Sequence, residues 1–215
     1  MILYWFLLLI TAIFAYGIGS MSTLLIASRF VFRTSLSSLG HGNIWISNFR
    51  RIYGVWGWIR LLLTELVKDA LPIGFGALLL GFKGHADVGC AFAGLCVVLG
   101  RLYPLFYDFK GSHATLCMIV MCLFASPSVG IAMAVVAAAV TFFTKYITLG
   151  TLAGAFVAVL ASLLLVDNDI VLKLILIAGG LTLIKHIPSI SRILNGREEK
   201  LSFEEDITYK LDQKF

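Results

Sequence analysis

The chain has 215 residues, of which 60% are hydrophobic and 13% are charged, and its mean hydropathy is +0.95. The charged fraction is about half that of an average soluble domain, which excludes a soluble domain of any size because too few polar side chains exist to cover one. The net charge of +5 indicates basic loops that face anionic ligands or lipid headgroups. Nucleic-acid binding is disfavoured, since no block of Lys or Arg is interleaved with aromatic residues.

The first predicted membrane-spanning helix covers residues 2–28. This segment has no charge, and it lacks the basic start and the short apolar core of a cleaved signal peptide. A span needs about 20 apolar residues. By that criterion further apolar segments follow the polar residues 29–54, at residues 55–80, 87–106, 114–144, 148–166 and 171–184.

The uncharged stretch at residues 114–144 is too long for a single span. It contains 31 residues, which extend about 46 Å at the helical rise of 1.5 Å. Ser126-Pro127-Ser128 lies in its middle and is a turn signal. We therefore predict a hairpin of two short helices, one of them a partial span, and an all-α bundle of about seven transmembrane helices.

Basic residues indicate the orientation of this bundle. The first loop and the C-terminal end are both rich in Lys and Arg, and cytoplasmic loops of membrane proteins carry that excess. If both are cytoplasmic, an odd number of spans lies between the N-terminus and the tail, which predicts an external N-terminus and a cytoplasmic C-terminus. The residues that carry this inference are Arg29, Arg33, Arg50, Arg51, Lys185, Arg192, Arg197 and Lys200.

Charges inside a span are expensive and are functional candidates by default. Glu65 and Lys68 are three residues apart on the second predicted helix, so they can pair with each other. A structural ion pair facing the bundle interior is an equally good interpretation. Such charges would favour a small transporter, but most ionisable residues gather at the inner face and no internal repeat is visible.

Four cysteines lie in apolar runs, and we interpret them as core or lipid-facing residues. They are Cys90, Cys96, Cys117 and Cys122. No Cys-x-x-Cys pair and no Cys/His cluster has the spacing of metal ligands. We therefore expect neither a structural disulfide nor a metal site nor another cofactor.

The predicted inner loops combine glycines, cations and imidazoles. Gly42-Asn43 in the first loop can let the backbone and a side-chain amide approach an anion, although Trp45 and Phe49 also fit a loop anchored among headgroups. In the third loop Lys110-Gly111-Ser112-His113 places a cation, a flexible backbone, a hydroxyl and an imidazole together. This combination suits an anionic substrate and proton transfer. The residues after Ile184 resemble a short amphipathic stretch at the membrane surface.

In order along the chain, these motifs resemble the bacterial acyl-phosphate:glycerol-3-phosphate acyltransferases (the PlsY family). Gly19-Ser20 before Arg29, and Gly42-Asn43 before Asn48, match its first two motifs. Glu65 and Lys68 resemble its D-x-x-K element, residues 100–111 its G-H-x-x-P-x-F-x-x-F-K-G loop, and residues 145–150 its R-Y-x-S-L element. The tail is similar to K-H-x-x-N-I-x-R-L-x-x-G-x-E-x-K, through Lys185, His186, Ile190, Arg192, Gly196, Glu198 and Lys200.

The phosphate-binding positions depart from the family pattern. Trp45 replaces a loop glycine, Arg101 replaces a histidine, His113 replaces the second lysine of the third loop, and Ser189 replaces the tail asparagine. Three interpretations follow: an enzyme in which Arg101 and His113 substitute, an enzyme with a different donor or acceptor, or a non-catalytic relative that binds anionic lipid or a phosphate-bearing ligand.

The resemblance implies a seven-helix protein of the bacterial inner membrane that transfers an acyl group from acyl-phosphate to the 1-hydroxyl of glycerol 3-phosphate, giving lysophosphatidate. We expect residues 1–200 to form one membrane domain surrounded by lipid and residues 201–215 a polar tail; the oligomeric state stays open. The catalytic candidates are Lys110, His113 and His186. The substrate-binding candidates are Ser20, Arg29, Gly42, Asn43, Asn48, Arg101 and Gly111.

Overall fold

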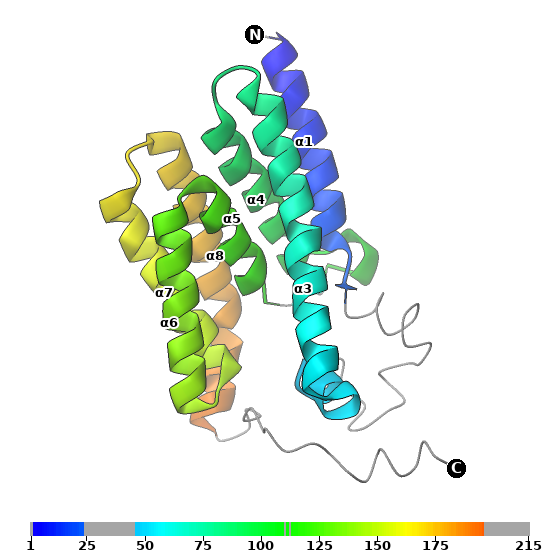
Figure 1. Ribbon diagram of the computed structural model, residues 1–215, viewed down its shortest axis with the longest axis vertical. Coiled ribbons are helices and arrows are strands. Elements are labelled where there is room, and N and C mark those ends of the chain that lie inside the picture. Colours follow the sequence, from blue (N-terminus) through cyan, green and yellow to red (C-terminus); the bar gives the residue numbers. More distant parts are fainter. Residues whose placement is uncertain (1, 24–45, 110, 112, 196–215) are drawn as a thin grey trace. The chain divides into compact units, whose positions relative to one another are not determined.

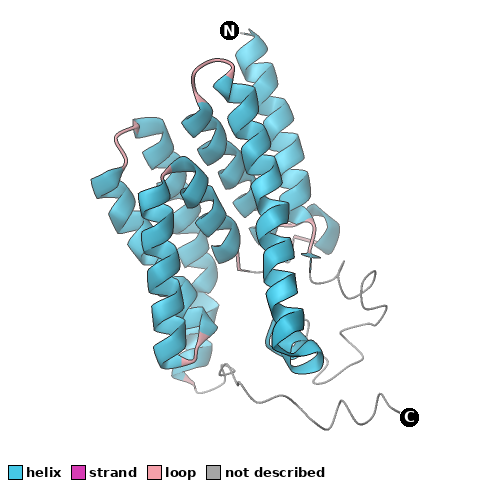
Figure 2. Cartoon of the chain, in the orientation of Figure 1, coloured by secondary structure: helices cyan, strands magenta, loops and turns pink. Residues whose placement is uncertain are grey.

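A computed structural model describes residues 2–23, 46–109, 111 and 113–195. Every regular element in these residues is a helix (Figures 1 and 2). The elements are α1 (Ile2–Ser20), α3 (Ile46–Gly81), α4 (Ala86–Leu102), the 3-10 helix η3 (Leu105–Tyr107), α5 (Thr115–Ala125), α6 (Pro127–Thr144), α7 (Ile147–Leu165) and α8 (Asp169–Leu194). The predicted all-α class is confirmed. The predicted polar tail, residues 201–215, lies outside the described residues.

The chain divides into two compact units. The first comprises residues 1–21 and 66–198, and the second comprises residues 22–65 and 199–215. The boundary falls within α3, between Glu65 and Leu66. The helical core of the first unit carries the residues whose contacts are described below.

The break predicted in the long apolar stretch is confirmed. Ser126 is extended, with φ −152°, and Pro127 opens α6, where its missing N–H costs no helical hydrogen bond. The 11 residues of α5 reach about 16 Å, which is shorter than the hydrocarbon core of a bilayer. The 18 residues of α6 are long enough to cross it.

Several predicted boundaries are wrong. The first helix ends at Ser20 rather than at residue 28. The second helix begins at Ile46 rather than at residue 55, so residues 46–54 are helical instead of part of a polar loop. The last helix does not end at residue 184 but runs from Asp169 to Leu194, through Pro188. The segment predicted as a separate surface stretch is therefore the end of α8. Packing explains this continuation, because His186 and Ser189 are both buried.

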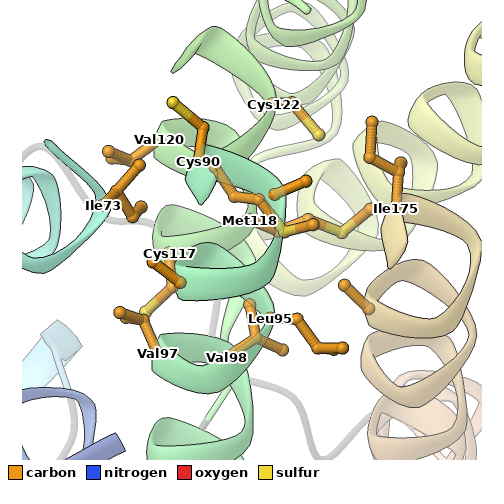
Figure 3. Packing of buried hydrophobic residues seen from close by; sticks show 14 of the residues in the cluster. Ile73, Cys90, Leu95, Val97, Val98, Cys117, Met118, Val120, Cys122 and Ile175 are labelled. Carbon is orange, nitrogen blue, oxygen red and sulfur yellow. The ribbon is translucent and has the colours of Figure 1, made fainter. Parts of the chain in front are cut away.

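Helix α4 lies at the centre of the first unit and packs against α1, α5 and α8. Its buried residues include small ones such as Ala91, Ala93 and Gly94. Figure 3 shows larger members of the buried hydrophobic cluster, among them Val97 and Val98 of α4, Met118 of α5 and Ile175 of α8. Close packing of small side chains is how helices associate in a membrane, where lipid gives no hydrophobic driving force between them. The four cysteines are free thiols buried in α4 and α5, which confirms them as core residues.

The outer surfaces of α1, α6 and α7 are apolar. Trp5, Leu9 and Ile13 on α1 are more than half exposed, as are Phe143 on α6 and Leu164 on α7. Within the described residues, α1, α6, α7 and residues 169–193 are long and apolar enough to cross a membrane. Exposed apolar side chains of this kind suit contact with lipid tails.

Helices α1 and α4 touch through their backbones near the ends of both helices. A Cβ added to Gly19 would lie 2.5 Å from the carbonyl oxygen of Val97, whereas a Cβ added to Gly17 would meet nothing within 4 Å. We expect Gly19→Ala to destabilise the protein by about 1–3 kcal/mol through overpacking. Gly17→Ala, on the same helix, should leave stability unchanged or slightly raised, because alanine favours the helix. Thermal unfolding of the purified protein in detergent measures both; equal midpoints would contradict the backbone contact.

Candidate active site

Two histidines that are far apart in the sequence lie against each other. The rings of His113, just before α5, and His186, on α8, are stacked with centroids 4.3 Å apart and planes 29° apart. His186 is fully buried and His113 is half-buried. The structure therefore brings together two of the three predicted catalytic residues, and it corrects any view of His186 as a surface histidine.

Both ring nitrogens of His186 have partners inside the bundle. Nδ1 lies 2.8 Å from the carbonyl oxygen of Thr182, and Nε2 lies 2.9 Å from the hydroxyl of Thr151. A carbonyl only accepts, so Nδ1 carries a hydrogen and donates it. The Thr151 hydroxyl also lies 2.9 Å from the carbonyl oxygen of Thr148. It donates to Nε2 when His186 is neutral and to Thr148 when both nitrogens are protonated, so His186 is hydrogen-bonded in either state.

Stacking disfavours a positive charge on both rings at once. Two unit charges at 4.3 Å repel each other by about 4 kcal/mol at an effective dielectric constant of about 20. An imidazole that is neutral can accept a proton, so the pair is chemically suited to proton transfer.

The loop between α4 and α5, which carries His113, turns sharply a few residues before this histidine. Asp108 and Phe109 adopt left-handed backbone conformations, with φ of 50° and 58°, and the Phe109 N–H donates to the carbonyl of Pro104 at 3.1 Å. A Cβ at Gly111 would overlap the carbonyl oxygens of Arg101 and Leu102. The close passage of the chain by the end of α4 therefore requires a glycine at position 111, independently of any ligand.

Of the remaining predicted site residues, some belong to the described part of the chain and others do not. Ser20 is buried and its hydroxyl donates to the carbonyl of Tyr16 at 2.8 Å, the back-bond expected of a serine in a span. Arg101 is half-buried in the last turn of α4. Asn48 belongs to the first turn of α3, but its side chain is not described. The others lie outside the described residues: Arg29, Gly42, Asn43 and Lys110.

Sequence reasoning missed Thr151, the hydroxyl partner of His186. It lies one residue beyond the 145–150 element, so the motif pointed to the right segment but not to the contact. It also missed the pairing of Lys68 with Asp69, whose atoms Nζ and Oδ1 are 3.5 Å apart. The predicted pairing of Lys68 with Glu65 stays untested.

A bundle of long apolar helices with exposed apolar surfaces is typical of an integral membrane protein. Comparison with known proteins gives its family. The family model described as glycerol-3-phosphate acyltransferase matches residues 9–196. This chain therefore belongs to the glycerol-3-phosphate acyltransferase family.

Individual relatives match over nearly their full lengths. The glycerol-3-phosphate acyltransferase of Finegoldia magna is 31% identical over 195 residues, which cover 90% of this chain and 96% of the relative. Glycerol-3-phosphate acyltransferase 3 of Bacillus anthracis is 30% identical, with coverages of 89% and 93%. The crystal structure of PlsY, an integral membrane glycerol 3-phosphate acyltransferase in its glycerol 3-phosphate form, is similar at a TM-score of 0.76 and 25% identity, covering 91% of this chain and 96% of that one. Its lysophosphatidic acid form gives the same values.

Proposed function

We propose that this protein transfers a fatty acyl group from acyl-phosphate to the 1-hydroxyl of glycerol 3-phosphate. The hydroxyl oxygen bonds to the acyl carbon, the bond from that carbon to the phosphate oxygen breaks, and lysophosphatidate and inorganic phosphate are released. The hydroxyl proton leaves to a base. A mixed anhydride already has a good leaving group, so the protein mainly has to hold two anions together and orient the hydroxyl.

One observation carries this proposal: the chain matches the acyltransferase family over residues 9–196 and shares the fold of PlsY at a TM-score of 0.76. The glycerol 3-phosphate and lysophosphatidic acid forms of PlsY contain, respectively, the acceptor and the product of the proposed reaction. The stacked histidines add a chemical reason, since acyl transfer to a hydroxyl benefits from a neutral imidazole.

We infer separate roles for the two histidines. Both nitrogens of His186 are hydrogen-bonded within the bundle, so His186 supports the adjacent ring. His113 is half-buried and lies in the loop that also carries Lys110, so it is the imidazole that accepts the hydroxyl proton. For the phosphates, we propose Lys110 and Arg29 as cationic ligands and Ser20, Asn43, Asn48 and the Arg101 side chain as further ligands, with Gly42 and Gly111 permitting close approach.

Turnover by the purified protein tests the proposal directly. Given palmitoyl-phosphate and glycerol 3-phosphate in detergent or lipid, the protein should release phosphate and form lysophosphatidate in equal amounts. Phosphate release without lysophosphatidate would indicate hydrolysis or a different acceptor. Well-folded protein that gives neither product would overturn the proposed function.

We further propose that the protein crosses a bacterial inner membrane seven times, with its N-terminus outside and its C-terminus inside. The described residues form seven α-helices, and the shorter ones would be partial spans or would cross a thinned bilayer. The basic first loop and tail support the orientation, because cytoplasmic loops carry an excess of Lys and Arg.

Cysteine labelling in intact cells tests this orientation. Lys83 is exposed in the turn between α3 and α4, and Asn195 is exposed just after α8. An impermeant maleimide should label Lys83→Cys from outside, whereas Asn195→Cys should react only after the cells are permeabilised. The native chain, whose four cysteines are buried, provides the background. The reverse pattern would overturn the topology.

A further inference from the structure

The ends of α1 and α4 lie next to each other in the first unit. A Cβ added to Gly100 would lie 2.5 Å from the carbonyl oxygen of Tyr16, and the same approach brings Gly19 against Val97. The Tyr16 hydroxyl donates to the carbonyl of Tyr103 at 2.7 Å. Two helix C-termini therefore sit side by side, each with carbonyls that lack an intrahelical partner and with the negative end of a helix dipole.

A lysine from another helix meets each of these ends. Lys68 of α3 donates through Nζ to the carbonyl of Met21, one residue past α1, at 2.9 Å. Its side chain is 15% exposed and pairs with the fully buried Asp69 at 3.5 Å. An ammonium in this place satisfies an open carbonyl at the end of α1 and balances the charge of the buried Asp69.

Lys185 of α8 makes the corresponding contact with α4. Its Nζ donates to the carbonyl of Leu102, the last residue of α4, at 3.2 Å. The same Nζ lies 4.7 Å from the centroid of the Tyr103 ring, within the range of a cation–π contact. Lys185 therefore contacts both the ring of Tyr103, the first residue after α4, and the carbonyl of Leu102 just before it.

Both helix ends lead into segments with proposed phosphate ligands. The chain runs from α1 to Arg29 and Asn43, and from α4 to Lys110 and His113. We propose that Lys68 and Lys185, the helix-end lysines, are positioning residues for this proposed acyl transfer. Each fixes the point where a substrate-binding segment leaves its helix, and Lys185 also offsets helix-end negative charge that would repel anionic substrates. The expected change in KM rests on the proposed function, whereas the expected change in the mobility of the loop after α4 does not.

Substitutions of Lys185 test the structural consequence with a readout that does not need turnover. Phe106, which is 60% exposed on η3, is replaced by cysteine and carries a nitroxide spin label; the native cysteines are buried. Adding Lys185→Met should raise the mobility of this label, and Lys185→Arg should restore it towards the native value. Lys173→Met, which removes an exposed lysine of the same helix, should change nothing.

Kinetics test the second consequence. Lys185→Met should raise the KM for glycerol 3-phosphate about tenfold, the loss expected for one hydrogen bond from a charged donor, with a smaller change in kcat and recovery in Lys185→Arg. Lys68→Met is combined with Asp69→Asn, so that no buried carboxylate loses its cation, and should also raise this KM about tenfold.

The outcomes separate this proposal from the proposed function. Unchanged label mobility and unchanged KM in Lys185→Met would overturn the positioning role. A loss of kcat that Lys185→Arg does not recover would also overturn it, since that pattern indicates chemistry specific to the lysine. Increased label mobility in a protein that shows no acyl transfer would support the positioning role while overturning the proposed function.

Discussion

Lys110→Ala is expected to lower acyl transfer about 1,000-fold while the protein still inserts in the membrane at native levels. Lys110 is the lysine retained from the family's third-loop motif, and we propose that it binds a substrate phosphate. A cation aimed at charge that develops on a leaving phosphate contributes at the upper end of electrostatic catalysis, where removing one donor costs about 100- to 1,000-fold. Release of phosphate from palmitoyl-phosphate in the presence of glycerol 3-phosphate measures the loss.

The matched control for this variant is Lys83→Ala. Lys83 is exposed in the turn at the opposite end of α4, so its removal should leave turnover at the native rate. Lys110→Arg should retain part of the activity, because the charge stays but the shape of the donor changes. Native turnover in Lys110→Ala would remove this residue from the proposed site.

His113→Phe is expected to lower kcat about 100-fold, with a smaller change in KM. Phenylalanine can keep the stack on His186 but cannot accept a proton, and a positioned general base typically contributes about 100- to 10,000-fold. His113→Lys restores the residue of the family motif, and it separates two roles for this position. If His113 only replaces a phosphate-binding cation, the lysine variant should be active; we expect it to be as slow as His113→Phe.

His85 provides the control for the histidine variants. It is exposed at the start of α4, where its ring contacts Tyr4 edge-on. His85→Phe keeps an aromatic ring there and should leave kcat unchanged. Full activity of His113→Phe would mean that another group takes the hydroxyl proton.

The helices themselves were largely predictable because they depend on local sequence. Apolar runs of span length identified α4 and α7 to within a few residues and the start of α1, and Pro127 marked the α5–α6 turn through its own backbone restriction. The family motifs likewise identified the segment with His186 and the element next to Thr151 before any contact was known. Length, composition and the order of motifs were enough to predict a membrane protein of this family, which the family match confirms.

Helix boundaries in polar or proline-containing segments were predicted wrongly. The first two turns of α3 contain Asn48, Arg50 and Arg51, which resemble a loop in composition, yet they are helical. The last helix was predicted to end at Ile184, because the apolar run stops at Lys185, yet the helix continues through Pro188, which removes a helical hydrogen bond. Burial of His186 and Ser189 outweighs that loss, and burial depends on neighbours that the local sequence does not reveal.

The amino-acid sequence alone determined that this chain is apolar, helical and embedded in a membrane, and which loop residues are candidates for binding phosphate. The tertiary structure decided which of them meet: it stacked His113 on His186, gave His186 its partner Thr151, and directed Lys185 to the end of α4. The physical reason is the range of the forces involved. Hydrophobicity and backbone preference act within a turn or two of helix, whereas a hydrogen bond or a ring stack needs partners only a few ångströms apart, and those partners are supplied by the packing of distant helices.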